Sequence, residues 1–134
     1  MAPSGSGATL SREMIDHVGF EVTNLERSGR FYDAVFSTLG VLRLHASEHA
    51  IAYGVTEPTF WLTARALPAQ TYGHVAVKAA GKAAVDAAHA AGVAAGGRCD
   101  GAPGRRPRYG PRYYAAYLRD PDGLRLEVVS GSGP

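Results

Sequence analysis

Two histidines stand at matching places in two stretches of this chain. His17 lies in MIDHVGFEV at residues 14–22, and His74 lies in TYGHVAVKA at residues 71–79. Imidazole binds metal ions and exchanges protons near neutral pH, so such a pair is a candidate for a metal site or for acid–base chemistry. One histidine alone is more often a structural residue at a strand edge. It is the repetition that raises the possibility of a shared site.

The residues around the first histidine predict a strand and then a helix. Apolar and polar residues alternate over residues 15–22, which is the period of a half-buried strand. The period changes in TNLERSGRFYDAVFSTLG, where Asn24 suits the N-cap and Gly40 can take the left-handed turn that ends a helix. Three short runs then predict strands: VLRLHA, AIAYG and TFWLTAR. The first half is therefore predicted to have the order βαβββ.

The second half of the chain repeats this order. GHVAVKA predicts a strand, GKAAVDAAHAAGVAAGG a helix closed by glycines, and YYAAYLRD and LRLEVVS two further strands. CDGAPGRRPRYGPR is predicted to be a loop, with room for a short strand near Arg98. The offset that superposes His17 on His74, 74 − 17 = 57, also superposes Gly40 on Gly97. The sequence therefore predicts an internal duplication.

Length and composition limit the classes of function. A chain of 134 residues fits one domain, which we expect at residues 14–130, with a disordered tail at 1–13 and a further tail at 131–134. A net charge of +2 without a broad basic face does not favour nucleic-acid binding. Cys99 is the single cysteine, which excludes an intrachain disulfide and indicates a reducing cytoplasm. We find neither a secretory signal nor a run of about 18 apolar residues, and so expect no membrane span.

The two modules, their histidines and the closing segment DPDGLRLEVV together resemble the vicinal oxygen chelate superfamily. That family includes glyoxalase I, fosfomycin-modifying thiol transferases, extradiol dioxygenases and bleomycin-resistance proteins. Its members place an Asp-Pro-x-Gly turn ahead of a metal-binding glutamate, and here the turn at residues 120–123 precedes Glu127. The resemblance covers residues 14–130. It implies an α/β (α+β), glyoxalase-like fold of two paired βαβββ modules, 14–66 and 72–130, that form a half-barrel cup.

The resemblance also implies a metal site built from His17, His74 and Glu127. Two imidazoles and one carboxylate suit a divalent ion such as Zn, Ni, Mn or Fe, and leave positions for substrate and water. Strand parity agrees, because each candidate alternates with apolar residues that would face the helices. Glyoxalase I has a fourth carboxylate on the last strand of its first module. Here TFWLTAR carries no acid, and Leu62 is expected opposite Glu127, which argues against a four-ligand site.

Further residues are expected on the same cup face as the histidines. Glu21 and Lys78 share their strand parity and would line the cavity or form a salt bridge at its rim. Tyr113 and Tyr117 share one face of YYAAYLRD, where their hydroxyls could donate hydrogen bonds or act as general acids. The alternative for the tyrosines is that they only fill space.

The cup is also expected to have a basic loop and an apolar wall. Arg112, beside the proline-rich loop, suits a substrate carboxylate or phosphate, although a solvated surface arginine is the common alternative. Phe60, Leu62 and Ala64 are predicted to face the cup, which favours an organic substrate over a bare phosphate or sugar.

Three functions follow from the resemblance. The first is a cytoplasmic, homodimeric, divalent-metal-dependent enzyme of the lyase or thiol transferase type, which chelates vicinal oxygens of a small organic molecule. The alternative is a protein of the bleomycin-resistance type that sequesters a small molecule without chemistry. The third is an extradiol dioxygenase, which is disfavoured because no second histidine lies on a predicted cup-facing strand of the second module. No residue stands out as the general base.

Overall fold

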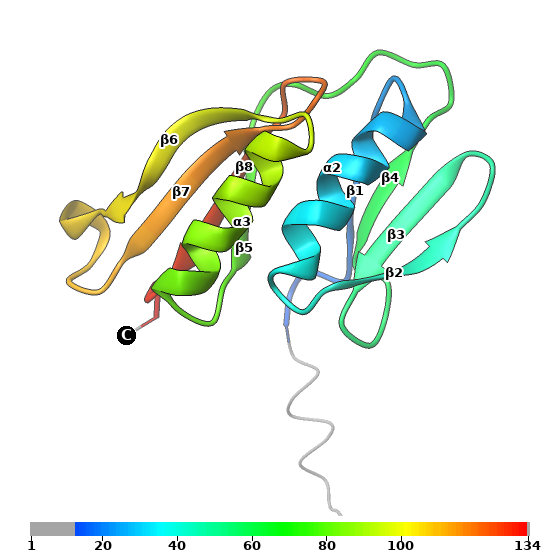
Figure 1. Cartoon of the computed structure of the whole chain (residues 1–134). Helices are drawn as coiled ribbons and strands as arrows, with labels where there is room; N and C mark the ends of the chain where they lie inside the picture. The colour runs from blue at the N-terminus through cyan, green and yellow to red at the C-terminus, as the bar shows by residue number, and fades with distance from the viewer. Residues whose placement is uncertain (1–12, 134) are drawn as a thin grey trace, which may run out of the picture.

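The computed structural model describes residues 13–133, so the tail predicted at 1–13 lies outside the described residues except for Glu13. The first half of the chain contains β1 (Val18–Glu21), α2 (Leu25–Ser37), β2 (Leu42–Ala46), β3 (Ala50–Gly54) and β4 (Phe60–Thr63). The second half contains β5 (His74–Lys78), α3 (Lys82–Ala94), β6 (Arg98–Arg105), the 3-10 helix η1 (Pro107–Tyr109), β7 (Tyr114–Arg119) and β8 (Arg125–Ser130). Figure 1 shows the two halves side by side, each with one helix over its strands.

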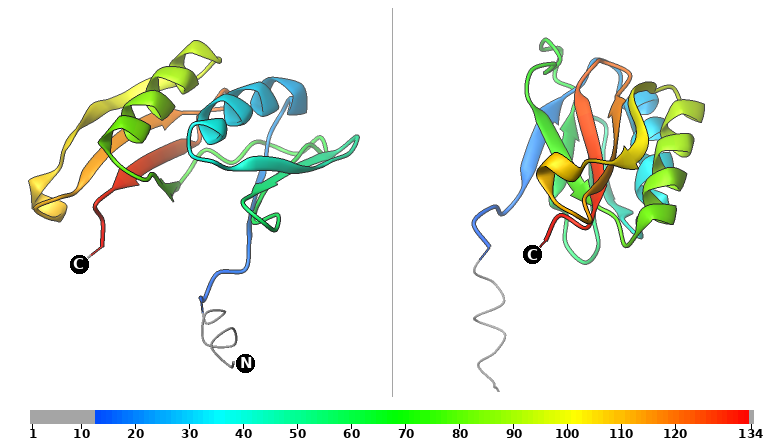
Figure 2. Two further views of the ribbon diagram at one scale, coloured as in Figure 1. Left: turned by 60° about the horizontal axis from the view of Figure 1, so that its bottom comes forward. Right: turned by 90° about the vertical axis from the view of Figure 1, so that its left-hand side faces the viewer.

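The strands form two separate four-stranded sheets, in the orders β1-β4-β3-β2 and β5-β8-β7-β6. In each sheet the first and last strands of the module pair in parallel, and the remaining pairs are antiparallel. Both helices lie on the same side of the two sheets (Figure 2). The opposite face of each sheet is left open. The predicted α+β fold of two βαβββ modules is thus confirmed.

The helices keep the offset of 57 residues that the histidines show. Helix α2 starts at Leu25 and α3 at Lys82, and 82 − 25 = 57. Asn24 caps α2 as predicted, because its side chain accepts a hydrogen bond of 2.8 Å from the backbone N–H of Arg27. The left-handed glycine after α3 is Gly96, with φ of 103°, one residue earlier than the position of Gly40 predicts.

One hydrophobic core lies beneath both helices and joins the two modules. The stripe of α2 that faces it holds Phe31, Tyr32, Val35 and Phe36, all buried. Helix α3 is richer in alanine and contributes Val85 and Ala88. Small residues let the modules approach closely: a Cβ on Gly97 would collide with the Phe31 ring, and one on Gly92 would lie 3.0 Å from a Val35 methyl group.

The first half of the segment predicted as a loop, where room was left for a short strand, belongs to an eight-residue strand, β6, and the second half contains η1. The strand pairs with β7 with register shifts at Cys99/Gly101 and at Gly101/Gly104. Strand β6 lies at the edge of its sheet, where proline and bulges are tolerated because one side needs no hydrogen-bonding partner. Glycine and proline therefore did not prevent β6 from pairing with β7, although their presence led the sequence pattern to predict a loop.

The Asp-Pro-Asp-Gly turn before β8 connects the two modules. Asp120 organises the turn, since its Oδ1 accepts hydrogen bonds from three backbone N–H groups at residues 122–124, and its Oδ2 accepts one of 2.7 Å from the hydroxyl of Tyr32 on α2. Burial raises the pKa of the Asp120 carboxyl. Asp122 accepts hydrogen bonds from the backbone and hydroxyl of Thr23 and forms an ion pair of 2.8 Å with Arg27. The turn therefore fixes the start of α2 against the second module.

No helix among residues 13–133 has both the length and the apolar character needed to cross a membrane.

Replacing Asp122 with alanine should weaken this connection between the modules. The Asp122 side chain is 7% exposed and accepts hydrogen bonds from three donors. Asp122→Ala should therefore lower the free energy of unfolding by about 1–3 kcal/mol, measured by urea denaturation. Glu48→Ala is the matched control, because that side chain is 88% exposed on a loop, and its change should stay within about 0.5 kcal/mol. Equal losses for the two variants would show that the turn does not hold the modules together.

Candidate functional site

The second module places His74 and Glu127 side by side on its open face. Strands β5 and β8 are parallel neighbours in which Ala76 pairs with Glu127, so His74 lies one side-chain position along the same face. His74 Nε2 is 3.9 Å from Glu127 Oε1. The carboxylate is 5% exposed, whereas the imidazole is 56% exposed. A buried acid thus lies beside a histidine that solvent can reach.

Tyr113 holds the other oxygen of this carboxylate. Its hydroxyl donates a hydrogen bond of 2.6 Å to Glu127 Oε2, and this bond, with desolvation, raises the pKa of Tyr113 to about 12. The phenol therefore stays protonated at neutral pH and serves as a donor. Glu127 Oε1 is left turned toward His74, available to a ligand or an ion.

These residues line a cavity of about 290 Å³ on the open face of the second sheet. Its walls are His74, Tyr109, Tyr113, Tyr117, Arg125 and Glu127. Tyr117 lines the cavity as expected. Arg125 was missed by the sequence analysis, although it has the parity of Glu127 two residues before it. Its guanidinium lies 4.3 Å from the centre of the Tyr117 ring and its Nε 3.2 Å from Asp100 Oδ2, so it is held in place from two sides.

A separate cavity of about 370 Å³ lies on the open face of the first sheet and contains His17. The histidine directly precedes β1, its side chain is 58% exposed, and its Nδ1 lies 2.7 Å from Asp16 Oδ1. This contact leaves Nε2 available for a metal. The lining residues are His17, Gly19, Phe20, Glu21, Trp61, Thr63, Arg65 and Gln70.

Glu21 lies in this cavity, as expected, but as a buried carboxylate rather than a partner of Lys78. It accepts hydrogen bonds from the Thr63 hydroxyl at 2.8 Å, from the Arg65 backbone N–H and from Arg65 Nε at 3.0 Å. Burial acts to raise the pKa of Glu21, but these hydrogen bonds outweigh it and lower the pKa overall. The side chain therefore carries a negative charge at neutral pH and anchors Arg65.

The prediction that Phe60, Leu62 and Ala64 face the cup was wrong, because the strand presents its other face, shifted by one residue. Phe60 and Leu62 are buried in the hydrophobic core beneath α2, and Ala64 packs against that core, so Leu62 does not line the cup. The open face carries Trp61 and Thr63 instead. Trp61 pairs with Gly19 in the first sheet, and Glu127 pairs with Ala76 in the second. Gly19 and Ala76 are related by the offset of the repeat, since 19 + 57 = 76. Trp61 therefore occupies the position in the first module that Glu127 occupies in the second. The absence of an acid there agrees with the expectation of no four-ligand site.

Two other candidates lie away from both cavities. Lys78 ends β5 with an exposed side chain, and Arg112 lies between η1 and β7. Neither is among the residues that line the cavities described above. The expected roles for Lys78 and Arg112 thus receive no support from their positions in a single chain.

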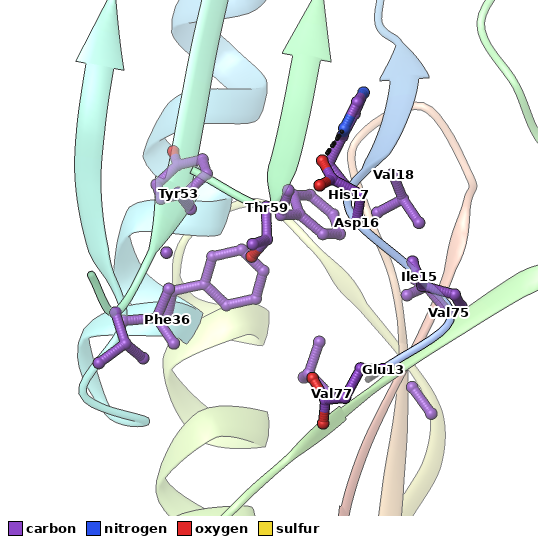
Figure 3. A pocket seen from close by; sticks show the side chains of 15 residues that line it. Glu13, Ile15, Asp16, His17, Val18, Phe36, Tyr53, Thr59, Val75 and Val77 are labelled. Carbon is purple, nitrogen blue, oxygen red and sulfur yellow. Dashed lines mark hydrogen bonds and ion pairs between the residues drawn. The ribbon is translucent and has the colours of Figure 1, made fainter. Parts of the chain in front are cut away.

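A third cavity, also about 370 Å³, lies at the junction of the modules (Figure 3). Its walls come from the segment leading into β1, from the end of α2 and from β5, with Phe36, Val75 and Val77 among them. His17 is its only metal-site candidate. We therefore place the chemistry on the open faces of the sheets.

The three predicted metal ligands do not meet within one chain. Among the residues that the structure describes, no three His, Cys, Asp or Glu side chains are grouped closely enough to hold a metal ion. His17 belongs to the cavity of the first sheet, and His74 and Glu127 belong to that of the second. The open face of the first sheet thus carries one of the three expected ligands, and that of the second sheet carries the other two.

The comparisons with known proteins cover most of the chain. The family model of the Glyoxalase/Bleomycin resistance protein/Dioxygenase superfamily matches residues 14–128. A crystal structure of a glyoxalase/bleomycin resistance protein from Albidiferax ferrireducens is 36% identical, with a TM-score of 0.77, and the match covers 87% of this chain and 98% of that one. No curated protein matches the chain.

Two more distant structures share the fold. A fosfomycin resistance protein from Mesorhizobium loti is 22% identical, with a TM-score of 0.64, and 89% of this chain and 92% of that one are covered. A lactoylglutathione lyase from Agrobacterium tumefaciens is 20% identical, with a TM-score of 0.66 and coverages of 91% and 96%. With a family model that spans almost the whole described chain and the two-module fold in agreement, this protein belongs to the glyoxalase/bleomycin resistance protein/dioxygenase superfamily.

Proposed function

We propose that this protein is a divalent-metal-dependent enzyme that binds vicinal oxygens of a small organic molecule, of the lyase or thiol transferase type. The observation that carries the proposal is the pairing of buried Glu127 with exposed His74. Their nearest nitrogen and oxygen are 3.9 Å apart, and small side-chain rotations would place both at about 2 Å from a shared ion. Tyr113 occupies the other carboxylate oxygen, as outer-shell partners of metal ligands commonly do.

The third ligand, His17, is proposed to come from a second copy of the chain. If the open face of one first module packs against the open face of another chain's second module, the two cavities join and His17 meets His74 and Glu127. A two-fold symmetric dimer repeats this contact, so it completes two sites at once. This arrangement is supported by the division of the ligands between two open faces in one chain. The dimer would work in the reducing cytoplasm that the single cysteine indicates.

The residues of the chain have distinct roles in this proposal. A bound divalent ion would supply Lewis-acid stabilisation of an enolate or alkoxide oxygen on the substrate. Tyr113 keeps Glu127 oriented and, with its high pKa, does not act as a base at neutral pH. Tyr117 and Arg125 line the same cavity, where a hydroxyl and a cation can orient the oxygens of a substrate.

Sequestration of a small molecule without chemistry is the second candidate. It is favoured by Trp61, which stands where the corresponding position of the second module holds Glu127 and which makes the first cavity better suited to packing than to chemistry. The extradiol dioxygenase is favoured least, because strands β5 to β8 carry no histidine besides His74.

Metal content separates the enzyme from the sequestering protein. Protein purified without chelator should contain about one divalent ion per chain, and His74→Ala should lose it, because a catalytic site of three protein ligands binds weakly once one is removed. Elemental analysis by mass spectrometry provides the measurement. His49→Ala, on an exposed loop, is the control and should keep its metal. Wild-type protein without stoichiometric metal would leave sequestration as the function.

Tyr113→Phe should weaken metal binding without removing a ligand. Loss of the hydrogen bond to Glu127 lets the carboxylate rotate, and loss of such outer-shell partners lowers metal affinity about 10–100-fold. Competition with a chromogenic chelator measures the change. Tyr72→Phe, at a ring that is almost fully exposed, should leave the affinity unchanged. An unchanged affinity in Tyr113→Phe would mean that Glu127 needs no such support.

Mixing two inactive variants tests whether the site spans two chains. His17→Ala and Glu127→Ala should each lose metal when alone. If His17 acts on the partner's site, a chain lacking His17 paired with a chain lacking Glu127 retains one intact site. Random exchange should then restore about one quarter of the wild-type metal content after unfolding and refolding the mixture. No restoration would mean that all three ligands come from one chain.

A further inference from the structure

The cavity on the first sheet contains two side chains that the proposed metal site does not use. They are Trp61, in the middle of β4, and Arg65, two residues after that strand ends. Both share the cavity with His17. Their chemistry differs from that of the second cavity, whose centre is the buried acid Glu127.

Trp61 stands above a sheet surface of very small residues. Its neighbours across the sheet are Gly19 on β1 and Ala52 on β3. Beyond Ala52 lies His45, whose ring centre is 5.2 Å from that of Trp61. On the side of β1, Gly19 has no side chain, and a Cβ built there would already be in van der Waals contact with the Trp61 Cβ, at 3.9 Å. This leaves room for a flat group to pack against Trp61.

Arg65 is hydrogen-bonded through its backbone N–H and Nε, whereas the far end of its guanidinium is not bonded to any of the described residues. Glu21 accepts hydrogen bonds from its backbone N–H and from Nε, and Glu21 is itself fixed by Thr63. The two terminal guanidinium nitrogens have no partner among the residues that the structure describes, and the side chain is 63% exposed. A guanidinium held through Nε presents its terminal N–H groups as a fork, the geometry that suits a carboxylate or phosphonate.

The loop beneath this arginine is also tied in place. Gln70 exchanges two hydrogen bonds with the backbone of Glu21: its side-chain oxygen accepts one of 2.7 Å, and its backbone N–H donates one of 3.3 Å. The carboxamide NH₂ of Gln70 remains as a further donor in the cavity. The polar wall of the cavity, to which Arg65 and Gln70 both belong, is thus held in place by these hydrogen bonds before a ligand binds.

We propose that this cavity is the substrate-recognition half of the site and that it selects a small organic anion with a flat aromatic or unsaturated group. The flat group packs on Trp61, and the carboxylate or phosphonate binds the terminal nitrogens of Arg65. His17 lines the same cavity, so a molecule bound there lies beside the proposed metal. The inference deepens the proposed function by naming the class of substrate, but its binding step needs no metal.

Trp61 makes this binding directly measurable, because it is the only tryptophan in the chain. Full-length protein treated with chelator is titrated with benzoate, with benzyl alcohol as the ring without the charge, and with acetate as the charge without the ring. Benzoate should quench the tryptophan fluorescence and bind at least about tenfold more tightly than the other two probes, since only it uses both halves of the cavity. Equal binding of benzoate and benzyl alcohol would overturn the role of Arg65.

Variants then separate the two contacts. Arg65→Gln should weaken benzoate binding about tenfold or more and leave benzyl alcohol unchanged, as expected for loss of a charge-assisted pair. Arg65→Lys keeps the charge without the fork and should give a smaller loss, so it serves if Arg65→Gln fails to fold. Arg30→Gln, exposed on α2, is the matched control. Trp61→Leu should lose the preference for benzoate over acetate, measured by calorimetry.

These outcomes are independent of the metal measurements. If benzoate binds and responds to Arg65 while no metal is found, the recognition site stands and the enzyme proposal fails. If metal is present but benzoate binding does not change in Arg65→Gln, the proposed substrate class is overturned and the metal site remains.

Discussion

The helices cover one face of each sheet, and this constraint assigns every strand side chain to the core or to the open face. Because strand residues alternate between the two faces, Leu62 lies in the core and Val18 packs against it, while Trp61 lies on the open face. The same rule in the second module buries Leu126 and Val128 and brings Glu127 to the other face. The chemistry of this protein is therefore decided by strand parity, once α2 and α3 are in place.

The Asp-Pro-Asp-Gly turn serves the fold as well as the site. It leads into β8, the strand that carries Glu127, and its two carboxylates bind Tyr32, Thr23 and Arg27 at the start of the first module. A single turn thus sets where β8 begins and how the two modules lie against each other. Burial of Asp120, which raises its pKa, is compensated by four hydrogen bonds to that side chain.

Duplication made two similar half-cups, and their differences are where function is expected. On the last strand of the second module, the side chain on the open face is Glu127, which accepts a hydrogen bond from Tyr113. On the last strand of the first module it is Trp61, which shares its cavity with Arg65, a cation hydrogen-bonded to Glu21. One half-cup is suited to hold an ion and the other to hold an organic anion. Joining them between two chains would place the substrate oxygens next to the metal, which is the geometry that metal-assisted chemistry on vicinal oxygens requires.

The sequence by itself determined the order of the elements apart from β6, the duplication with its offset of 57, the family, and the face on which Glu127 would lie. Those features depend on local patterns: a period of two or 3.6, a capping Asn24, and a turn motif at a known distance from an acid. They need no knowledge of what packs against the strand. The resemblance to the family then named His17, His74 and Glu127 together.

Only the tertiary structure decided which face of β4 is inside, that β6 is a strand, and that His17 lies apart from His74. In TFWLTAR both faces carry a large apolar side chain, so alternation alone does not show which face is buried, and it is Trp61 rather than Leu62 that lies on the open face. In β6, bulges and an edge position accommodate glycine and proline, and pairing with β7 outweighs local preference. The separation of the histidines follows from how two sheets pack, a long-range arrangement that no local pattern records.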